Sequence, residues 1–293
     1  MRIALATCSV MPDQFTDDQL VAEELAKLGA DVTYEPWDAE LEWAGFDAVA
    51  VRSPWDYSRR REEFVAWADA AGPQLHNPAD LLRWNSDKTY MGDLEAAGLA
   101  VVETEFVEPG DAWEGGDQEV VVKPSVSAGG RDTGRFGPWV HDEARALIKA
   151  IHSSGRTAMV QPFQASVDNA GETALVFIDG ELSHSLRKRS VLRPDEVAPT
   201  RKTDLMVAEA MYDPELVTSG AHEADELELA ERIVSHVAER FGYVPLYARI
   251  DMLRDRDGAP VLLELEAVEP NLYFDQAPQG ARRLAEAIIG RIA

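Results

Sequence analysis

The strongest constraint on the fold comes from residues 1–84, where short apolar runs alternate with helix-forming segments. One helix is expected to begin at Thr16, a typical N-cap residue that precedes two aspartates, and to end at Gly29. A second helix is expected over Glu62–Ala70. Strand–helix alternation of this kind folds as a parallel sheet with helices on its faces. The runs that predict its strands are Arg2–Thr7, Asp31–Glu35 and Asp47–Arg52.

From about Asn85 the alternation gives way to strand pairs with fewer helices between them. Asp179-Gly180, between two such strands, is a strong hairpin signal. The pattern predicts two α+β lobes that face each other across a cleft, with boundaries at residues 1–84, 85–164 and 165–293. The expected strands are Val101–Val107, Glu119–Lys123, Met159–Phe163, Glu172–Ile178, Glu181–Leu186, Leu246–Leu253 and Val261–Glu266, and the expected helices are Asp87–Ala97, His141–Ser153, Asp225–Phe241 and Gly280–Ile292.

Charge and composition narrow the range of partners. The chain has 293 residues and a formal net charge of -25, which disfavours binding to nucleic acid or to an anionic membrane. No segment has the roughly 20 consecutive apolar residues that span a bilayer, and the N-terminus lacks a signal-peptide pattern. Cys8 is the single cysteine, so an internal disulfide is excluded. These features favour a cytoplasmic protein that acts on small molecules.

Three acids near the C-terminal end of the sequence form the most informative cluster. Asp251 lies on one expected strand, and Glu264 and Glu266 lie two residues apart on the next, so both point to one face. If the strands pair through the intervening turn, Asp251 comes close to both glutamates, with Leu263 and Leu265 on the opposite face. Such carboxylates repel each other unless a cation lies among them, and oxygen ligands suit magnesium that bridges phosphates. The alternative is a solvated strand face.

Two lysines precede segments that suit phosphate binding. Lys123 ends an apolar strand, and Ser125–Arg131 after it is rich in small residues that let backbone N–H groups approach a phosphate. Ser127, Gly129 and Gly130 are the candidates in this loop. Lys88 opens the helix expected after Asn85. An ordinary flexible turn and an exposed helix lysine are the respective alternatives.

Further candidates are more scattered. The strand with Gln161 and Phe163 runs into a proline, which frees backbone groups for an adenine, and Glu172 could accept ribose hydroxyls. Arg52 and Asp56 follow a strand end and are candidates for substrate contact, with a structural Arg–Asp pair as the alternative. A basic stretch could hold a γ-phosphate or a substrate carboxylate, or could be a solvated loop. It comprises Arg187, Lys188, Arg189, Arg193, Arg201 and Lys202.

The order of these features along the chain resembles that of the ATP-grasp superfamily from about Asn85 onward, preceded by the small α/β domain usual in that superfamily. The resemblance implies that ATP lies between two lobes. For ATP, it implies Lys88 and Lys123 on the α- and β-phosphates, Ser127–Gly130 as the phosphate-covering loop, Gln161 and Phe163 at adenine, and Glu172 at ribose. It implies that magnesium binds to Asp251, Glu264 and Glu266. For the reaction, it implies Arg249 at the oxyanion, Lys188 as a further catalytic residue, and Arg187 and Asn271 at the substrate.

Finer motifs resemble those of cycloserine-biosynthesis ligases that close a ring on O-ureido-serine. They are Arg52–Tyr57, Leu82–Lys88, Ser127–Thr133 and Leu263–Glu266 with Glu269-Pro270. Two departures stand out. Glu266 stands where many members of the ATP-grasp superfamily have asparagine at the third metal position, and Asn271 is the alternative ligand there. Ser190–Asp204 differs from the corresponding segment of the cycloserine-biosynthesis ligases.

The resemblance implies an enzyme that uses ATP and Mg²⁺, with Mn²⁺ as an alternative metal. It would activate a carboxylate of a small amino-acid-like substrate as an acyl phosphate, which a nitrogen nucleophile captures in an amide-forming or ring-closing step of antibiotic or other secondary metabolism. A small-molecule kinase would use a similar cleft, and a non-catalytic ATP-binding protein is the alternative from another class. Related enzymes are often dimers, so a homodimer is an open alternative.

Overall fold

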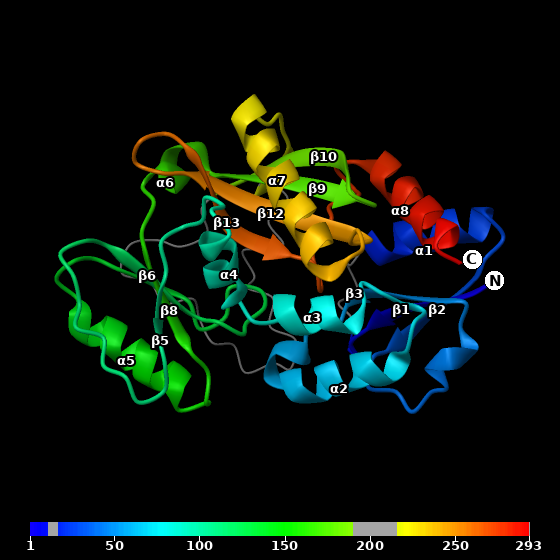
Figure 1. Cartoon of the computed structure of the whole chain (residues 1–293), viewed down its shortest axis with the longest axis horizontal. Coiled ribbons are helices and arrows are strands. Elements are labelled where there is room, and N and C mark those ends of the chain that lie inside the picture. Colours follow the sequence, from blue (N-terminus) through cyan, green and yellow to red (C-terminus); the bar gives the residue numbers. More distant parts are fainter. Residues whose placement is uncertain (11–16, 190–215, 293) are drawn as a thin grey trace.

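A computed structural model describes residues 1–10, 17–189 and 216–292. Figure 1 shows three sheets in succession along the chain, with helices packed against them. The expected N-cap Thr16 and the segment Ser190–Asp204, together with Arg193, Arg201 and Lys202, lie outside the described residues. Among the described residues, no helix combines the length and apolar character needed to cross a membrane.

The first sheet is parallel, as the strand–helix alternation predicts, and has the strand order β2-β1-β3-β4. Its central strands are almost wholly buried because apolar residues cover both of their faces. Its strands are β1 Arg2–Thr7, β2 Asp31–Pro36, β3 Ala48–Ser53 and β4 Leu75–His76, and its helices are α1 Asp17–Lys27 and α2 Arg61–Ala71.

The second sheet is antiparallel, in the order β5-β8-β6-β7, and α5 (His141–His152) packs against it. Its strands are β5 Glu105–Val107, β8 Ala158–Pro162, β6 Val120–Pro124 and β7 Gly134–Phe136. The expected strand from Val101 is shorter than predicted, because Val101 forms only an isolated bridge with Leu262. The glycine-rich segment after Lys123 connects β6 to β7, and β7 is a strand that the sequence analysis did not predict.

The third sheet, also antiparallel, has the order β11-β10-β9-β12-β13. Alternate residues of β9 face opposite layers: Val176 packs in the cluster with α1 and α8, while Phe177 packs in the cluster with α7. Asp179 and Gly180 both have positive φ, 52° and 80°, which confirms the hairpin between β9 and β10. The elements are β9 Glu172–Ile178, β10 Glu181–Lys188, β11 Val217–Ser219, β12 Tyr247–Arg254, β13 Pro260–Glu266, α6 Ser166–Ala170, α7 Ala224–Phe241 and α8 Pro278–Gly290.

A β-bulge changes the predicted facing of one leucine. Asp251 pairs with Glu264, but Met252 pairs with Leu262, so Leu263 is the extra residue on β13. Leu262 and Leu265 pack together in the core beneath α7, whereas Leu263 lines the cavity described below. The sequence analysis placed Leu263 on the same face as Leu265, and that placement is wrong because simple alternation does not hold across a bulge.

The helix expected over Asp87–Ala97 is also shorter than predicted. The structure has α3 over Ala79–Asn85 and α4 over Tyr90–Ala96, with a turn between them. In this turn the backbone N–H of Lys88 donates to the carbonyl of Ser125 at 2.8 Å, so it is not available to a helix. The turn thus fixes Lys88 beside the loop that follows β6.

Candidate active site

A cavity of about 250 Å³ lies where the second and third sheets meet the N-terminal α/β domain, residues 1–84, called the first lobe below. Its polar walls come from segments that are far apart in the sequence. The lining residues are Trp55, Lys88, Lys123, Ser127, Ala128, Gly129, Gly130, Arg131, Thr133, Glu172, Lys188, Arg189, Leu216, Arg249, Asp251, Leu263, Glu264, Glu266, Glu269, Asn271 and Tyr273.

The pairing of β12 with β13 builds the acidic wall. Asp251 lies opposite Glu264, and Arg249 lies opposite Glu266. Directly opposed residues on antiparallel strands have neighbouring side chains on one face, so all four groups meet at the cavity. The predicted association of the three acids is confirmed, since Asp251, Glu264 and Glu266 all line it.

Arg249 binds two of these acids at once. Its Nε and Nη2 donate to the two oxygens of Asp251, each at 2.9 Å, and Nη2 also pairs with Glu266. Its Nη1 donates to the carbonyl of Asn271 at 2.7 Å. A bidentate arginine–carboxylate contact is strong and directional. Arg249 is only 3% exposed, so these contacts fix its guanidinium in the wall.

Lys188, on β10, links the acidic wall to Glu172 at the start of β9. Its Nζ lies 2.8 Å from Glu172 and 2.8 Å from Asp251. Burial lowers the pKa of Lys188, but the nearby charges of Asp251 and Glu172 outweigh that effect and raise it. The pKa of Asp251 is lowered despite its burial, because Arg249 and Lys188 favour the charged carboxylate. Both groups are therefore charged at neutral pH.

Lys88 and Lys123 form the opposite, cationic side. The Nζ of Lys88 lies 3.2 Å from Glu264 and donates to the Ser127 carbonyl at 2.8 Å. Lys123 is 8% exposed, and burial lowers its pKa although Glu264 counteracts this effect. Gly129 and Gly130 have φ of 64° and 67°, a left-handed conformation that favours glycine and lets the loop turn tightly beside these lysines.

The donor set suits a hard divalent cation. Burial raises the pKa of Glu266 to about 7, with Arg249 opposing this shift and Glu264 and Asp251 adding to it. A bound cation would relieve that repulsion, and carboxylate oxygens are preferred magnesium ligands. As they stand in the described part of the chain, these acids pair with the protein's own cations, Glu266 with Arg249 and Glu264 with Lys88 at 3.2 Å, and do not form a group of three that could hold a metal ion.

The predicted adenine residues do not line this cavity. Gln161 is 2% exposed, and its side-chain amide donates to the Thr104 hydroxyl at 2.8 Å. Phe163 packs against Arg135, whose guanidinium carbon Cζ lies 3.4 Å from the centroid of the Phe163 ring. Both residues belong to the second sheet or its end, and their role at adenine stays a prediction.

Three predicted substrate residues also lie elsewhere. Arg52 is fully buried and pairs with Asp18 at 3.1 Å, so a structural pair forms, though with a different acid from the expected Asp56. Asp56 instead accepts a hydrogen bond from Trp37 Nε1 at 2.8 Å. Arg187 alternates with Lys188 along β10 and contacts Thr173 and Glu226 on the other face. Asn271, the fourth predicted substrate residue, does line the cavity.

The cavity also contains residues that the sequence analysis did not single out. Arg131 ties the glycine loop to the first lobe, because it donates to the Ala128 carbonyl at 3.0 Å, the Trp55 carbonyl at 3.0 Å and the Ser58 hydroxyl at 2.7 Å. In the sequence, its position directly after Gly129 and Gly130 was the signal that could have identified Arg131 as a site residue.

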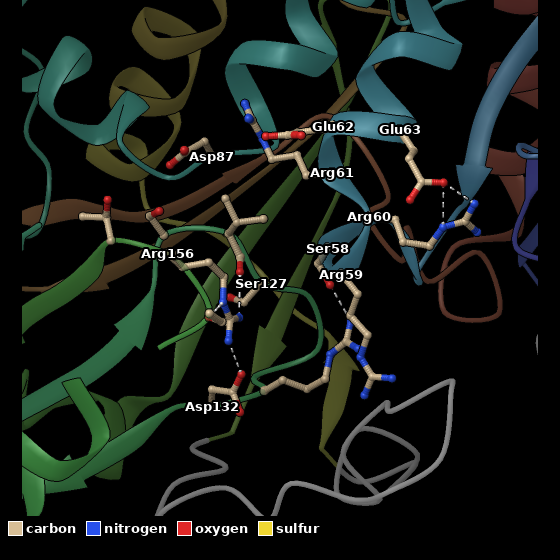
Figure 2. A pocket seen from close by; sticks show the side chains of 16 residues that line it. Ser58, Arg59, Arg60, Arg61, Glu62, Glu63, Asp87, Ser127, Asp132 and Arg156 are labelled. Carbon is tan, nitrogen blue, oxygen red and sulfur yellow. Dashed lines mark hydrogen bonds and ion pairs between the residues drawn. The ribbon is translucent and has the colours of Figure 1, made fainter. Parts of the chain in front are cut away.

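A second opening of about 620 Å³ lies beside this loop, and Figure 2 shows Arg156 paired with Asp132 there. Ser127 and Arg131 line both spaces.

Comparisons with solved structures define the fold. The chain superposes on D-alanine–D-alanine ligase from Bacillus anthracis in complex with ATP with a TM-score of 0.67, 12% identity, and coverage of 100% of this chain and 97% of that chain. A RimK domain ATP-grasp protein from Sphaerobacter thermophilus gives a TM-score of 0.65, 17% identity, and coverage of 99% and 100%. The fold is that of the ATP-grasp ligases, so the predicted α/β domain followed by a two-lobed α+β unit is confirmed. The exact domain boundaries stay a prediction.

Closer relatives specify the family. A model of the N-terminal domain of D-cycloserine synthetase DcsG matches residues 3–77. The crystal structure of D-cycloserine synthetase DcsG gives a TM-score of 0.87, 28% identity and full coverage of both chains. The cycloserine biosynthesis protein DcsG of Streptomyces lavendulae is 32% identical over 271 residues, which cover 87% of this chain and 86% of that protein. The chain belongs to the DcsG-related family of ATP-grasp ligases, which are ATP-dependent enzymes that form carbon–nitrogen bonds.

Proposed function

We propose that this enzyme activates the carboxylate of a small amino-acid-like substrate as an acyl phosphate and lets a nitrogen nucleophile capture it. The observation that carries the proposal is the meeting of Lys88, Lys123, Lys188 and Arg249, from four separate segments, at the acidic strand pair in one cavity. A triphosphate and a carboxylate are anionic, so their reaction needs this density of positive charge.

Each side chain then has a task that its contacts support. Lys88 and Lys123 would bind ATP phosphates beside the glycine loop, and Glu172 would accept ribose hydroxyls. Asp251, Glu264 and Glu266 would hold Mg²⁺, which neutralises phosphate charge when bound. Arg249, fixed by Asp251 and Asn271, would stabilise the oxyanion that forms when nitrogen attacks the acyl phosphate. Lys188, between Glu172 and Asp251, would support charge on the transferred phosphoryl group.

The kinship with DcsG suggests the type of product. A relative named D-cycloserine synthetase makes a cyclic amino-acid derivative, and a nitrogen within the substrate is the simplest nucleophile for ring closure. We therefore propose that the reaction of this chain is an intramolecular cyclisation on an O-ureido-serine-like substrate in an antibiotic or other secondary-metabolite pathway. Asn271, a predicted substrate residue, lines the same cavity as the proposed phosphate-binding lysines, which supports a substrate site next to ATP.

Isotope transfer tests the acyl phosphate directly. O-Ureido-serine labelled with ¹⁸O in its carboxylate is incubated with ATP, Mg²⁺ and enzyme, and the phosphate released is analysed by mass spectrometry. The carboxylate oxygen forms a bond to the γ-phosphorus, and its bond to carbon breaks when nitrogen attacks, so one ¹⁸O atom should appear in free phosphate. Stable phosphorylated product would instead indicate a kinase, and ATP binding without turnover a non-catalytic protein.

Two neighbouring residues on β10 provide matched variants for this assay. Lys188→Met removes a cation that faces the cavity, and we expect phosphate release to fall about 100-fold or more. Arg187→Met removes a cation from the opposite face and should change the rate less than about threefold. Equal losses in both variants would contradict the assignment of Lys188.

A further inference from the structure

The acidic residues of the cavity are unequally compensated by the protein's own cations. Asp251 contacts Arg249 and Lys188, and Glu264 contacts Lys88 at 3.2 Å. Glu269 lines the same cavity, but no lysine or arginine of the described chain lies within ion-pair distance of its carboxylate. The nearby Tyr57 side chain lowers the pKa of this carboxyl.

Glu269 is held at the side of the cavity nearest the first lobe. Its backbone carbonyl accepts a hydrogen bond from Trp55 Nε1 at 3.4 Å, and Trp55 also lines the cavity. Tyr57 is only 3% exposed and packs against Phe64, so its ring is held in place near Glu269. The backbone of Glu269 is thus held by Trp55, while its side chain lines the cavity and is accessible to a bound molecule.

A cation bound in the cavity would favour the ionised form of Glu269, which burial disfavours. Burial raises the pKa of Glu269 to about 8, with the nearby Glu266 adding to the shift and Lys88 opposing it. A metal ion is a poorer candidate than an ammonium group at this point, because magnesium and calcium take several oxygen ligands whereas an ammonium group needs only one carboxylate. An ammonium group can also contact an aromatic ring such as that of Trp55, which lines the cavity.

We propose that Glu269 binds the ammonium group of the substrate and thereby selects amino acids over the corresponding acids that lack an amino group. This inference rests on the proposed function, since it assigns the second charge of the same amino-acid-like substrate. The substrate carboxylate would face the cations around Arg249, and its ammonium would face the first lobe. Glu269 thus acts as a specificity-determining residue, and the first lobe contributes to specificity through Trp55, which lines the same cavity.

Binding measurements test this assignment independently of turnover. Alanine, serine and O-ureido-serine, each paired with its deaminated counterpart, are titrated into the full-length enzyme in the presence of ADP and Mg²⁺. For the best-bound pair we expect the wild-type enzyme to prefer the amino compound by about 30-fold or more, and Glu269→Gln to reduce that preference to within about threefold. Glu269→Asp, which keeps the charge, should retain part of the preference.

Matched variants separate recognition from general damage. Glu264→Gln, on the same wall, should change the affinity for both members of a pair to the same extent. Equal weakening of both members by Glu269→Gln, or a wild-type enzyme without preference in any pair, would overturn the proposal. Selective binding without transfer of ¹⁸O to phosphate would contradict the proposed function and leave the assignment of Glu269 intact.

Discussion

Two buried arginines, Arg52 and Arg249, each lie at a strand of a sheet and each pair with aspartate. Around Arg52 the acids are closed off: Ser53 donates to Asp18 at 2.6 Å, and backbone N–H groups of residues 272–274 donate to Asp17. Around Arg249 the acids Asp251 and Glu266 line an open cavity and share their charge with Lys188.

The comparison shows what distinguishes a structural ion pair from a site. Both arginines are buried, at 0% and 3% exposure, so burial alone does not separate them. The difference lies in where the lone pairs of the acids are used. The Arg52 cluster uses them on the protein's own backbone and hydroxyl groups, whereas the Arg249 cluster keeps several acids side by side at a space that a ligand can enter. Breaking the first should therefore cost stability, and breaking the second should cost activity.

The largest effect is expected for Arg52→Met. This change leaves the buried Asp17 and Asp18 without their cation, and we expect a loss of about 3–5 kcal/mol in the free energy of unfolding. Urea denaturation followed by circular dichroism measures it. Arg60→Met is the control, because Arg60 pairs with Asp38 and Glu63 near the surface and should contribute less than about 1 kcal/mol. Similar losses in both variants would mean that the Arg52 cluster has no special structural role.

The second prediction concerns Glu264→Gln in the open cluster. Removing this charge takes away a predicted metal ligand and the partner of Lys88, so we expect kcat/KM to fall about 10²–10³-fold, equivalent to about 2.7–4 kcal/mol. Some loss of stability is also expected, because Lys88 and Lys123 outweigh burial and the repulsion from Asp251 and hold the pKa of Glu264 below its usual range. The rates are therefore compared at a temperature where circular dichroism shows both proteins to be folded. Glu181→Gln, at an exposed glutamate paired with Arg283, is the control and should keep full activity. A stable fold with undiminished turnover in Glu264→Gln would contradict the site.

The smallest effect is a pH dependence that neither cluster should cause. Burial lowers the pKa of His76 to about 4, and Arg291 adds to the shift. The unfolded chain binds this proton near its ordinary pKa of 6.5, so the contribution of His76 to stability is present above pH 6.5 and is lost as the pH falls toward 4. We expect the wild-type protein to lose about 1 kcal/mol more than His76→Gln between pH 6.5 and 5, measured by urea denaturation at each pH. Identical pH profiles would assign the acid sensitivity elsewhere.

Much of the site follows from short-range pattern. Alternation along two strands joined by a turn was enough to bring Asp251, Glu264 and Glu266 together. Other features depend on information that one segment does not carry. Arg187 and Lys188 are adjacent basic residues, and only the pairing of β10 with β9, which sets Lys188 opposite Glu172, shows which of them faces the cavity.

The failures have the same origin. Arg52 and Asp56 lie close in sequence and suggest a pair, but the actual partner of Arg52 is Asp18. Asp18 lies on α1, which follows β1, and the pairing of β1 with β3 brings it beside Arg52. The bulge at Leu263 shifts the alternation by one residue, and no local sequence signal marks it. Glu269 was visible only as part of a motif, because its lack of a cationic partner is a property of the assembled cavity.

The contacts of Asp17 also determine when the enzyme can become active during its synthesis. This residue accepts hydrogen bonds from the N–H groups of Leu272, Tyr273 and Phe274, more than 250 positions later in the chain, as the separations of 255, 256 and 257 residues show. The neighbouring carbonyl of Asn271 holds Arg249. A nascent chain therefore cannot complete the contacts of Arg249 until residues 271–274 have left the ribosome and met α1. Partly synthesised chains should accordingly lack ligase activity, even when their first lobe has already folded.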